Sequence, residues 1–227
     1  MTIADRIKPG IQALDLLEIL YSFHDIRLLE IVRYICEEKP HFDEAKAKNP
    51  RAKRSVAKAL QHTPDFVQPT HFIQQAEGFA GVRKDMAELK EIDPNQVEIA
   101  SYVPEGDKRP RVHEALKVVS RVRTKNGVFH IPLLDLDIPV DEGGAASAEE
   151  VFVNLGIRSG AVLDSGKSYH AWGLELLPDK DWHDFMYKAL LLDRIDRRWV
   201  GHRLIDGHAN LRISEKRKKV PTVVHVF

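Results

Sequence analysis

Residues 159–177, SGAVLDSGKSYHAWGLELL, restrict the fold more than any other part of the chain. They contain Gly-Lys-Ser, which closes a nucleotide-binding P-loop, but the spacing of Gly160 and Gly166 is one residue too long for that motif. After the turn, Tyr169, Ala171 and Gly173 alternate with the residues between them, which is the period of a strand. A P-loop lysine and serine would instead open a helix. We therefore expect two strands joined by a turn.

The composition limits the class of protein. The chain has 227 residues, with 34 lysines and arginines against 34 aspartates and glutamates, so affinity for a polyanion must come from local patches. The single cysteine, Cys36, excludes an internal disulfide and a zinc ribbon. With no apolar run of membrane length and no signal peptide at the start, we expect a soluble, cytoplasmic protein with no membrane partner.

The pattern divides the chain into two parts. Apolar residues at helical spacing over residues 11–36 predict two helices or one broken helix, and residues 1–105 are expected to be mainly helical. We expect a short helix over residues 51–63, a helix around residues 83–91 and a strand over residues 97–103. The densest basic stretch of this part is a solvated surface or a phosphate contact. It consists of Lys46, Lys48, Arg51, Lys53, Arg54 and Lys58.

Residues 106–227 form the second part, which begins after a run of Pro and Gly residues. Two apolar segments, 115–124 and 128–140, flank Lys-Asn-Gly and predict a β-hairpin. A capping box of Ser147 and Glu150 predicts a helix from residue 147. Strands around the 164–166 turn, a helix over residues 181–192, a further helix through residue 203 and two closing strands follow. The expected fold is α+β, a mostly antiparallel sheet with helices on one face.

Asp135 and Asp137 lie in LLDLDIP, within the second arm of the expected hairpin. Alternate residues of a strand point to the same face, so both carboxylates should lie side by side. Two anions among apolar neighbours raise each other's pKa unless a cation lies between them. Carboxylates of this kind suit Mg²⁺ or Mn²⁺. The alternative is a strand end with two solvated aspartates.

The turn of the opening segment complements that pair. Gly166 allows the backbone to approach an anion, Lys167 adds positive charge, and Ser165, Ser168 and His170 can orient phosphate oxygens. A cationic turn beside a carboxylate pair meets the requirements of phosphoryl transfer, which depends on positioning and charge neutralisation.

These motifs resemble the archaeo-eukaryotic primase superfamily, the catalytic core of primase-polymerases. LLDLDIP, then DSGKSYHAWG, then RIDRRWVGHRLIDGHANLRIS follow one another over residues 129–214, in the order of that family's three motifs. The resemblance implies an RRM-like core in a small prokaryotic or mobile-element primase-like protein. Asp135 and Asp137 match its metal-binding first motif, and Ser165 and His170 match its phosphate-binding second motif.

The resemblance also implies the activity. A two-metal, template-directed nucleotidyltransferase would use Asp135, Asp137 and a third acidic residue as catalytic metal ligands for Mg²⁺ or Mn²⁺. Asp196 is preferred as the third, with Asp206 as the alternative. The nucleotide-binding residues would be Ser165, Lys167, Ser168, His170 and Arg212. The implied partners are nucleoside triphosphates, a nucleic acid template and a helicase or other replication protein.

Two alternatives remain. The zinc-binding cysteines of many primases are absent, so the chain could be a catalytically degenerate protein that binds nucleic acid or a partner. A metal-dependent nuclease would use the same carboxylates but leaves the 165–170 turn unexplained. A second basic cluster would contact template or triphosphate, or form a charged surface. It consists of Arg197, Arg198, Arg203, Arg212 and the segment EKRKK at residues 215–219.

The alternation also predicts the geometry of the site. His170, Trp172 and Leu174 should face the same side of the sheet as the two aspartates, and Tyr169 and Ala171 should face a helix. His170 should lie within roughly 10 Å of the carboxylates, which is about the reach of a triphosphate across a two-metal site.

Overall fold

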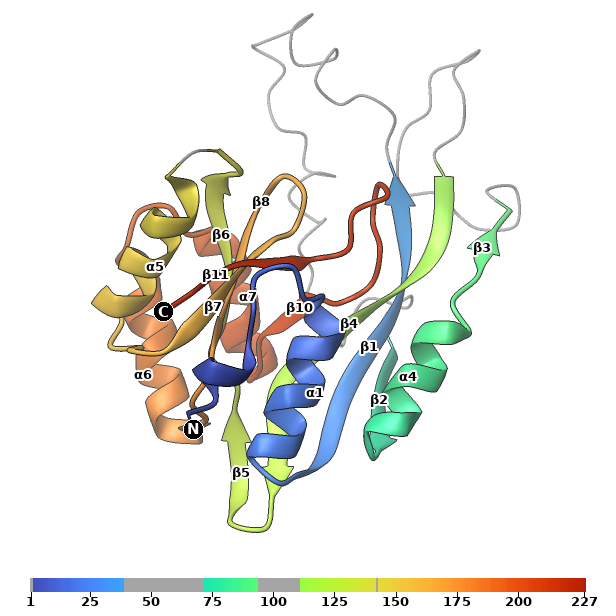
Figure 1. The fold of residues 1–227 in the computed structure, drawn as a ribbon, viewed down its shortest axis with the longest axis horizontal. Helices are drawn as coiled ribbons and strands as arrows, with labels where there is room; N and C mark the ends of the chain where they lie inside the picture. Colours follow the sequence, from blue (N-terminus) through green and yellow to red (C-terminus); the bar gives the residue numbers. More distant parts are fainter. Residues whose placement is uncertain (1, 39–71, 94–110, 142) are drawn as a thin grey trace, which may run out of the picture.

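The computed structural model describes residues 2–38, 72–93, 111–141 and 143–227. The expected helix over residues 51–63, the expected strand over residues 97–103 and the basic stretch between Lys46 and Lys58 lie outside the described residues. The α+β class is confirmed, because the described elements form two antiparallel sheets with α-helices packed on them (Figure 1).

The N-terminal elements are η1 (Ala4–Arg6), α1 (Ala13–Phe23), β1 (Ile26–Glu38), β2 (Phe72–Glu77), α4 (Phe79–Ala87) and β3 (Glu91–Ile92). The helix expected in the second half of residues 11–36 is wrong, since β1 occupies it. Four consecutive residues of β1, from Leu29 to Val32, are buried, so this strand shows no alternation that would distinguish it from a helix. The division of the chain between residues 105 and 106 stays a prediction.

The seven-stranded sheet has the order β2-β1-β4-β5-β9, and β10 and β3 also pair with β4. The expected hairpin is confirmed by β4 (Arg111–Thr124) and β5 (Gly127–His130), with Thr124 opposite Gly127. Its second arm was expected to be one strand, which is wrong. The chain leaves this sheet after His130, and β6 (Leu133–Pro139) belongs to the other sheet. Pro132 lies between them and has no N–H to continue the ladder.

The four-stranded sheet has the order β11-β7-β8-β6, formed by β11 (Thr222–Val226), β7 (Gly160–Asp164), β8 (Ser168–Gly173) and β6. The turn between β7 and β8 confirms the strand interpretation of the opening segment. Helix α5 (Gly144–Asn154) covers one face, and its N-cap is Gly143, which shows that the capping box at Ser147 is wrong. A side chain at Gly144 would approach the Tyr169 ring to 2.6 Å, so glycine permits this close contact between helix and sheet.

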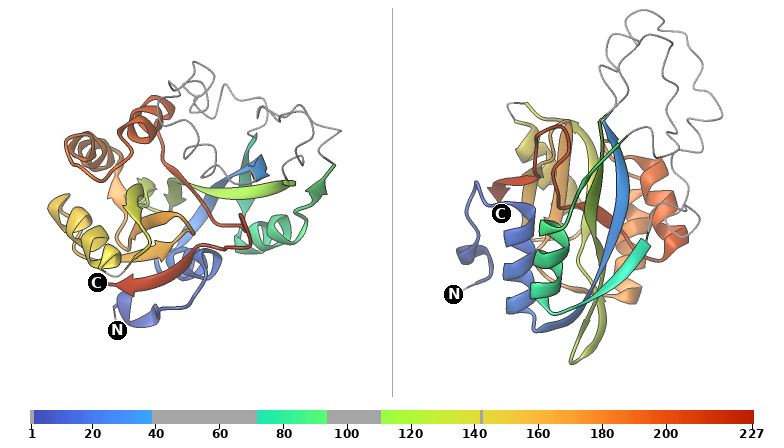
Figure 2. Two further views of the ribbon diagram at one scale, coloured as in Figure 1. Left: turned by 90° about the horizontal axis from the view of Figure 1, so that it is seen from above. Right: turned by 90° about the vertical axis from the view of Figure 1, so that its right-hand side faces the viewer.

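The remaining elements are β9 (Leu177–Pro178), α6 (Asp179–Ala189), α7 (Arg197–Asp206) and β10 (Asn210–Arg212). Figure 2 shows α1 and α4 on one side of the long strands β1 and β4, and α6 and α7 on the other. One hydrophobic cluster joins α1, both sheets and α5, and it includes the fully buried Trp172 and Trp182. None of the described helices is long and apolar enough to span a membrane.

Candidate active site at the edge of the four-stranded sheet

Asp135 lies directly opposite His170 in the antiparallel pair of β6 and β8. Partners in such a pair project to the same face, and the His170 Nε2 atom lies 4.0 Å from the Asp135 Oδ1 atom. Tyr169 faces the other side, where its hydroxyl donates to the Asp141 carbonyl beside α5. The predicted facing of His170 and Tyr169 is therefore confirmed, and so is the closeness of His170 to Asp135.

On its other side, β6 pairs with the segment that leads into α7. Leu136 forms an antiparallel bridge with Ile195, and the Asp137 N–H donates to the Arg194 carbonyl at 2.9 Å. In this register Asp196 comes opposite Asp135 and on the same face. Asp196 is also the N-cap of α7, where its Oδ1 atom accepts from two backbone N–H groups, those of Arg198 and Trp199.

The charge environment of Asp135 follows from this position. Burial and, after it, repulsion from the facing carboxylate of Asp196 raise the pKa of Asp135 to about 7. Three cations act in the opposite direction, namely Lys216, Arg212 and Lys117. The Asp135 side chain remains 38% exposed, so a ligand can reach it. The site therefore holds a carboxylate that is incompletely neutralised by its protein neighbours.

His170 is neutral at physiological pH. Burial and, after it, the nearby cations Arg212 and Lys216 lower its pKa to about 3. A neutral imidazole has one N–H donor and one acceptor nitrogen, so it can orient an anion through a hydrogen bond without adding a full charge.

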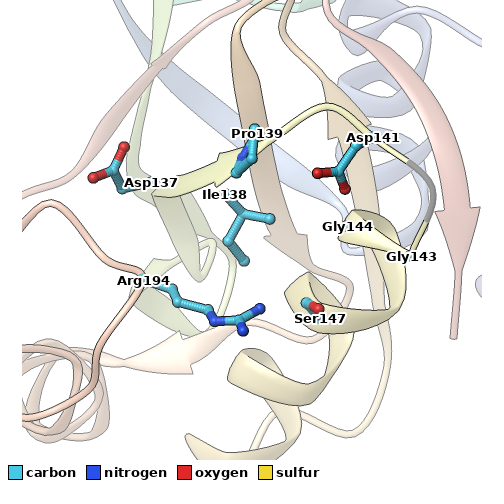
Figure 3. Close-up of a pocket in the computed structure, with 8 residues that line it drawn as sticks. All are labelled: Asp137, Ile138, Pro139, Asp141, Gly143, Gly144, Ser147 and Arg194. Carbon is cyan, nitrogen blue, oxygen red and sulfur yellow. The ribbon is translucent and has the colours of Figure 1, made fainter.

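Asp137 lies two residues along β6 and is exposed. It lines a pocket of about 360 Å³ with Arg194, Ser147 and the start of α5. Figure 3 shows the Arg194 side chain extending below Ile138 toward Ser147, whereas the Asp137 carboxylate points away from them. The pocket therefore lies at the end of β6, beside the start of α5.

Asp206, the alternative third acidic residue, has a different environment. It is the last residue of α7, about 15 Å from the N-cap Asp196 at the rise of an α-helix. Its carboxylate is fully buried and pairs with Arg203, whose Nη2 atom lies 2.9 Å from the Asp206 Oδ2 atom.

The turn between β7 and β8 uses several of its polar groups internally. The Ser165 hydroxyl and N–H both donate to the Ser168 carbonyl, and the Gly166 N–H donates to the Asp164 carboxylate at 2.8 Å. Gly166 has a φ of 113°, which disfavours any side chain. The Lys167 side chain is exposed at the tip. The turn is consequently closed by its own hydrogen bonds, and Lys167 is its outward charge.

Arg212 fixes that turn to the C-terminal part of the chain. Its guanidinium donates to the carbonyls of Ser165 at 2.6 Å, Ser214 at 2.5 Å and Lys219 at 3.0 Å. Arg212 thus bonds the backbone in this structure while its charge still acts on Asp135 and His170.

The described residues contain no group of three or more His, Cys, Asp or Glu side chains arranged to hold a metal ion. Asp135 and Asp196 face each other in the register of β6, and Asp137 lies two residues further along this strand, beside Arg194. Sequence reasoning missed Lys117, which reaches the site through the pairing of β4 with β10, where Lys117 lies opposite Arg212. No local pattern in the sequence carries that information.

Comparison with known proteins gives one result. A family model described as archaeo-eukaryotic primase 1D-like (AEP-like) matches residues 108–225, more than half of the 227 residues. The matched range includes β4 and both motif strands, β6 and β8. No curated protein and no solved structure matches the chain.

Proposed function

The chain belongs to the archaeo-eukaryotic primase 1D-like family, and on that premise we propose that it is a metal-dependent nucleotidyltransferase of primase-polymerase type that adds nucleotides on a nucleic acid template. The observation that carries the proposal is the register of β6. It sets Asp135 between His170 of β8 and the Asp196 segment, on one face of the sheet.

The residues present fit a divalent cation. Asp135 and Asp196 are facing carboxylates whose repulsion contributes to the raised pKa of Asp135, and a bound cation would remove that repulsion. Among the described residues, no lysine or arginine forms an ion pair with Asp135 or Asp137 that would neutralise these carboxylates in place of a metal. Magnesium or manganese, when bound, would activate the attacking 3′ hydroxyl and stabilise the departing pyrophosphate.

We assign the residues as follows. Asp135, Asp137 and Asp196 would hold the metal, and Asp196 is preferred to Asp206 because the latter is buried against Arg203. His170 would donate a hydrogen bond to a phosphate oxygen, and Lys167 and Ser168 would contact the same triphosphate from the turn. Ser165 and Arg212 would act mainly by holding that turn, since their donors already bond backbone carbonyls.

A protein that binds nucleic acid or a partner without turnover is the second candidate. It is favoured by the absence, among the described residues, of a gathered three-ligand metal group, and by the engagement of Asp196 as a helix cap. A helicase or other replication protein would be the partner in either case.

The test is primer extension on a template with Mg²⁺ or Mn²⁺, which compares the wild-type protein with Asp135→Ala and Asp137→Ala. Both variants should lose extension, and Glu175→Ala, which removes an exposed carboxylate outside the site, should retain it. Equal activity in the wild type and both site variants would overturn the assignment. An inactive wild-type protein that still binds the template would favour the second candidate.

The third ligand has its own test. Asp196→Ser removes the carboxylate but keeps a good N-cap, so the variant should fold with wild-type stability and lose extension. Asp206→Asn leaves the Arg203 charge buried without its ion partner, so it should lower the melting temperature while the folded fraction remains active. The opposite result would exchange the two roles.

A further inference from the structure

Residues 216–219, Lys-Arg-Lys-Lys, form a tight β-turn between β10 and β11. The Lys216 N–H donates to the Lys219 carbonyl, and the Lys219 N–H donates to the Lys216 carbonyl, each at 3.0 Å. Arg217 and Lys218 have φ values of 53° and 60°, which is the left-handed pair of a type I′ turn. We call this segment the 216–219 turn.

The residue choice of the turn conflicts with its backbone. Type I′ turns strongly prefer Asn-Gly or similar pairs, because a side chain in the left-handed region costs roughly 1 to 2 kcal/mol per residue. Arg217 and Lys218 are the only two consecutive non-glycine residues with positive φ in the described part of the chain. Such an outlier indicates that the side chains have a role that the backbone alone does not explain.

Both ends of the turn are fixed to the rest of the molecule. The residue before it, Glu215, pairs with Arg111 at 3.2 Å and accepts from the His113 Nε2 atom through its carbonyl. At the other end, the Lys219 Nζ atom lies 2.6 Å from the Asp164 carboxylate of β7. The turn therefore connects β4 of the larger sheet with β7 of the smaller one.

The cations divide into two pairs. Lys219 is paired with Asp164, and Lys216 is half-buried and acts electrostatically on Asp135 and His170. Arg217 and Lys218 are exposed at the tip. The tip is thus a local positive surface on a chain with no net formal charge, and it adjoins Lys216, which acts on Asp135.

We infer that the tip of the 216–219 turn binds the phosphate backbone of single-stranded nucleic acid next to the Asp135 site. That this strand is a template or primer rests on the proposed function. A bound triphosphate is a poorer match, because the turn residue that acts on Asp135 is Lys216 at the base, whereas Arg217 and Lys218 are exposed at the tip. A strand that extends beyond the site offers further phosphates to those charges.

The test uses the double variant Arg217→Asn with Lys218→Gly in the full chain. Asn-Gly is a preferred type I′ pair, so the variant removes two charges while it favours the same turn. Its melting temperature should equal or exceed that of the wild type. The affinity for a fluorescein-labelled oligothymidylate, measured by anisotropy without divalent ions, should fall on the order of tenfold, and the salt slope should fall by about 1.4 for two lost contacts.

The control variant Lys84→Gln with Arg158→Gln removes two exposed cations elsewhere, and it should keep the wild-type affinity and salt slope. The inference is overturned if the wild type does not bind the oligonucleotide, or if the turn variant keeps its affinity and salt slope. It is also overturned if only the affinity for a nucleoside triphosphate falls. This affinity is measured without metal and without turnover. A loss of affinity in the turn variant therefore supports the inference even if primer extension fails.

Discussion

Two turns lie against each other beside the site, and they solve the same backbone problem with different residues. The β7–β8 turn has glycine at its left-handed position, and its serine and aspartate satisfy the backbone locally. The 216–219 turn has Arg217 and Lys218 at its left-handed positions. Lys219 and Arg212 connect the two turns, since Lys219 pairs with Asp164 and Arg212 donates to a carbonyl in each.

The difference separates a structural role from a functional one. Where residue type and conformation agree, as at Gly166, the sequence is explained by the fold alone. Where they disagree, as at Arg217 and Lys218, an explanation must come from the side chains, and their shared property is positive charge. Substitutions that exchange the two solutions test this view.

The largest effect on stability is expected from Gly166→Ala. A side chain at a φ of 113° is strained, and its Cβ atom would lie 3.4 Å from the Lys219 Cγ atom, so we expect a loss of about 2 kcal/mol in the free energy of unfolding. Urea denaturation measures it. Gly201→Ala in α7 is the matched control, because nothing lies near its Cβ and helix propensity predicts a gain of up to about 1 kcal/mol. An unchanged Gly166→Ala protein would remove the distinction between the turns.

A smaller loss is expected from the ion pair that joins them. Asp164→Asn keeps an acceptor for the Gly166 N–H but removes the charge that faces Lys219, and the lysine is 40% exposed, so screening limits the loss to about 1 kcal/mol. A double-mutant cycle with Lys219→Met isolates the pair. A coupling energy that persists at high salt would show that the contact is not mainly ionic.

The smallest effect, and of opposite sign, is expected from Lys218→Gly. Relief of left-handed strain exceeds the entropic cost of glycine only slightly, so the free energy of unfolding should rise by about 0.5 kcal/mol. The same denaturation experiment detects it. A clear destabilisation would mean that Lys218 makes a contact that stabilises the fold, which would weaken the argument for nucleic acid binding.

The sequence predicted the local geometry of the site better than the path of the chain. The alternation around His170 and in LLDLDIP led to the face that Asp135 shares with His170, because successive side chains of a strand point to opposite faces. The same approach failed for β1, whose buried residues on both faces resemble a helix stripe. It also missed Lys117, since the pairing of β4 with β10 joins segments far apart in the sequence.

Calorimetric titration with Mn²⁺ tests the central claim, that Asp135 and its neighbours hold a catalytic divalent ion. The wild type should bind the ion more tightly at a pH above the Asp135 pKa of about 7 than below it, because the acid must lose its proton to become a ligand. Asp135→Asn should bind weakly at both pH values, while Glu175→Ala should behave as wild type. Equal binding by the wild type and Asp135→Asn would contradict the account.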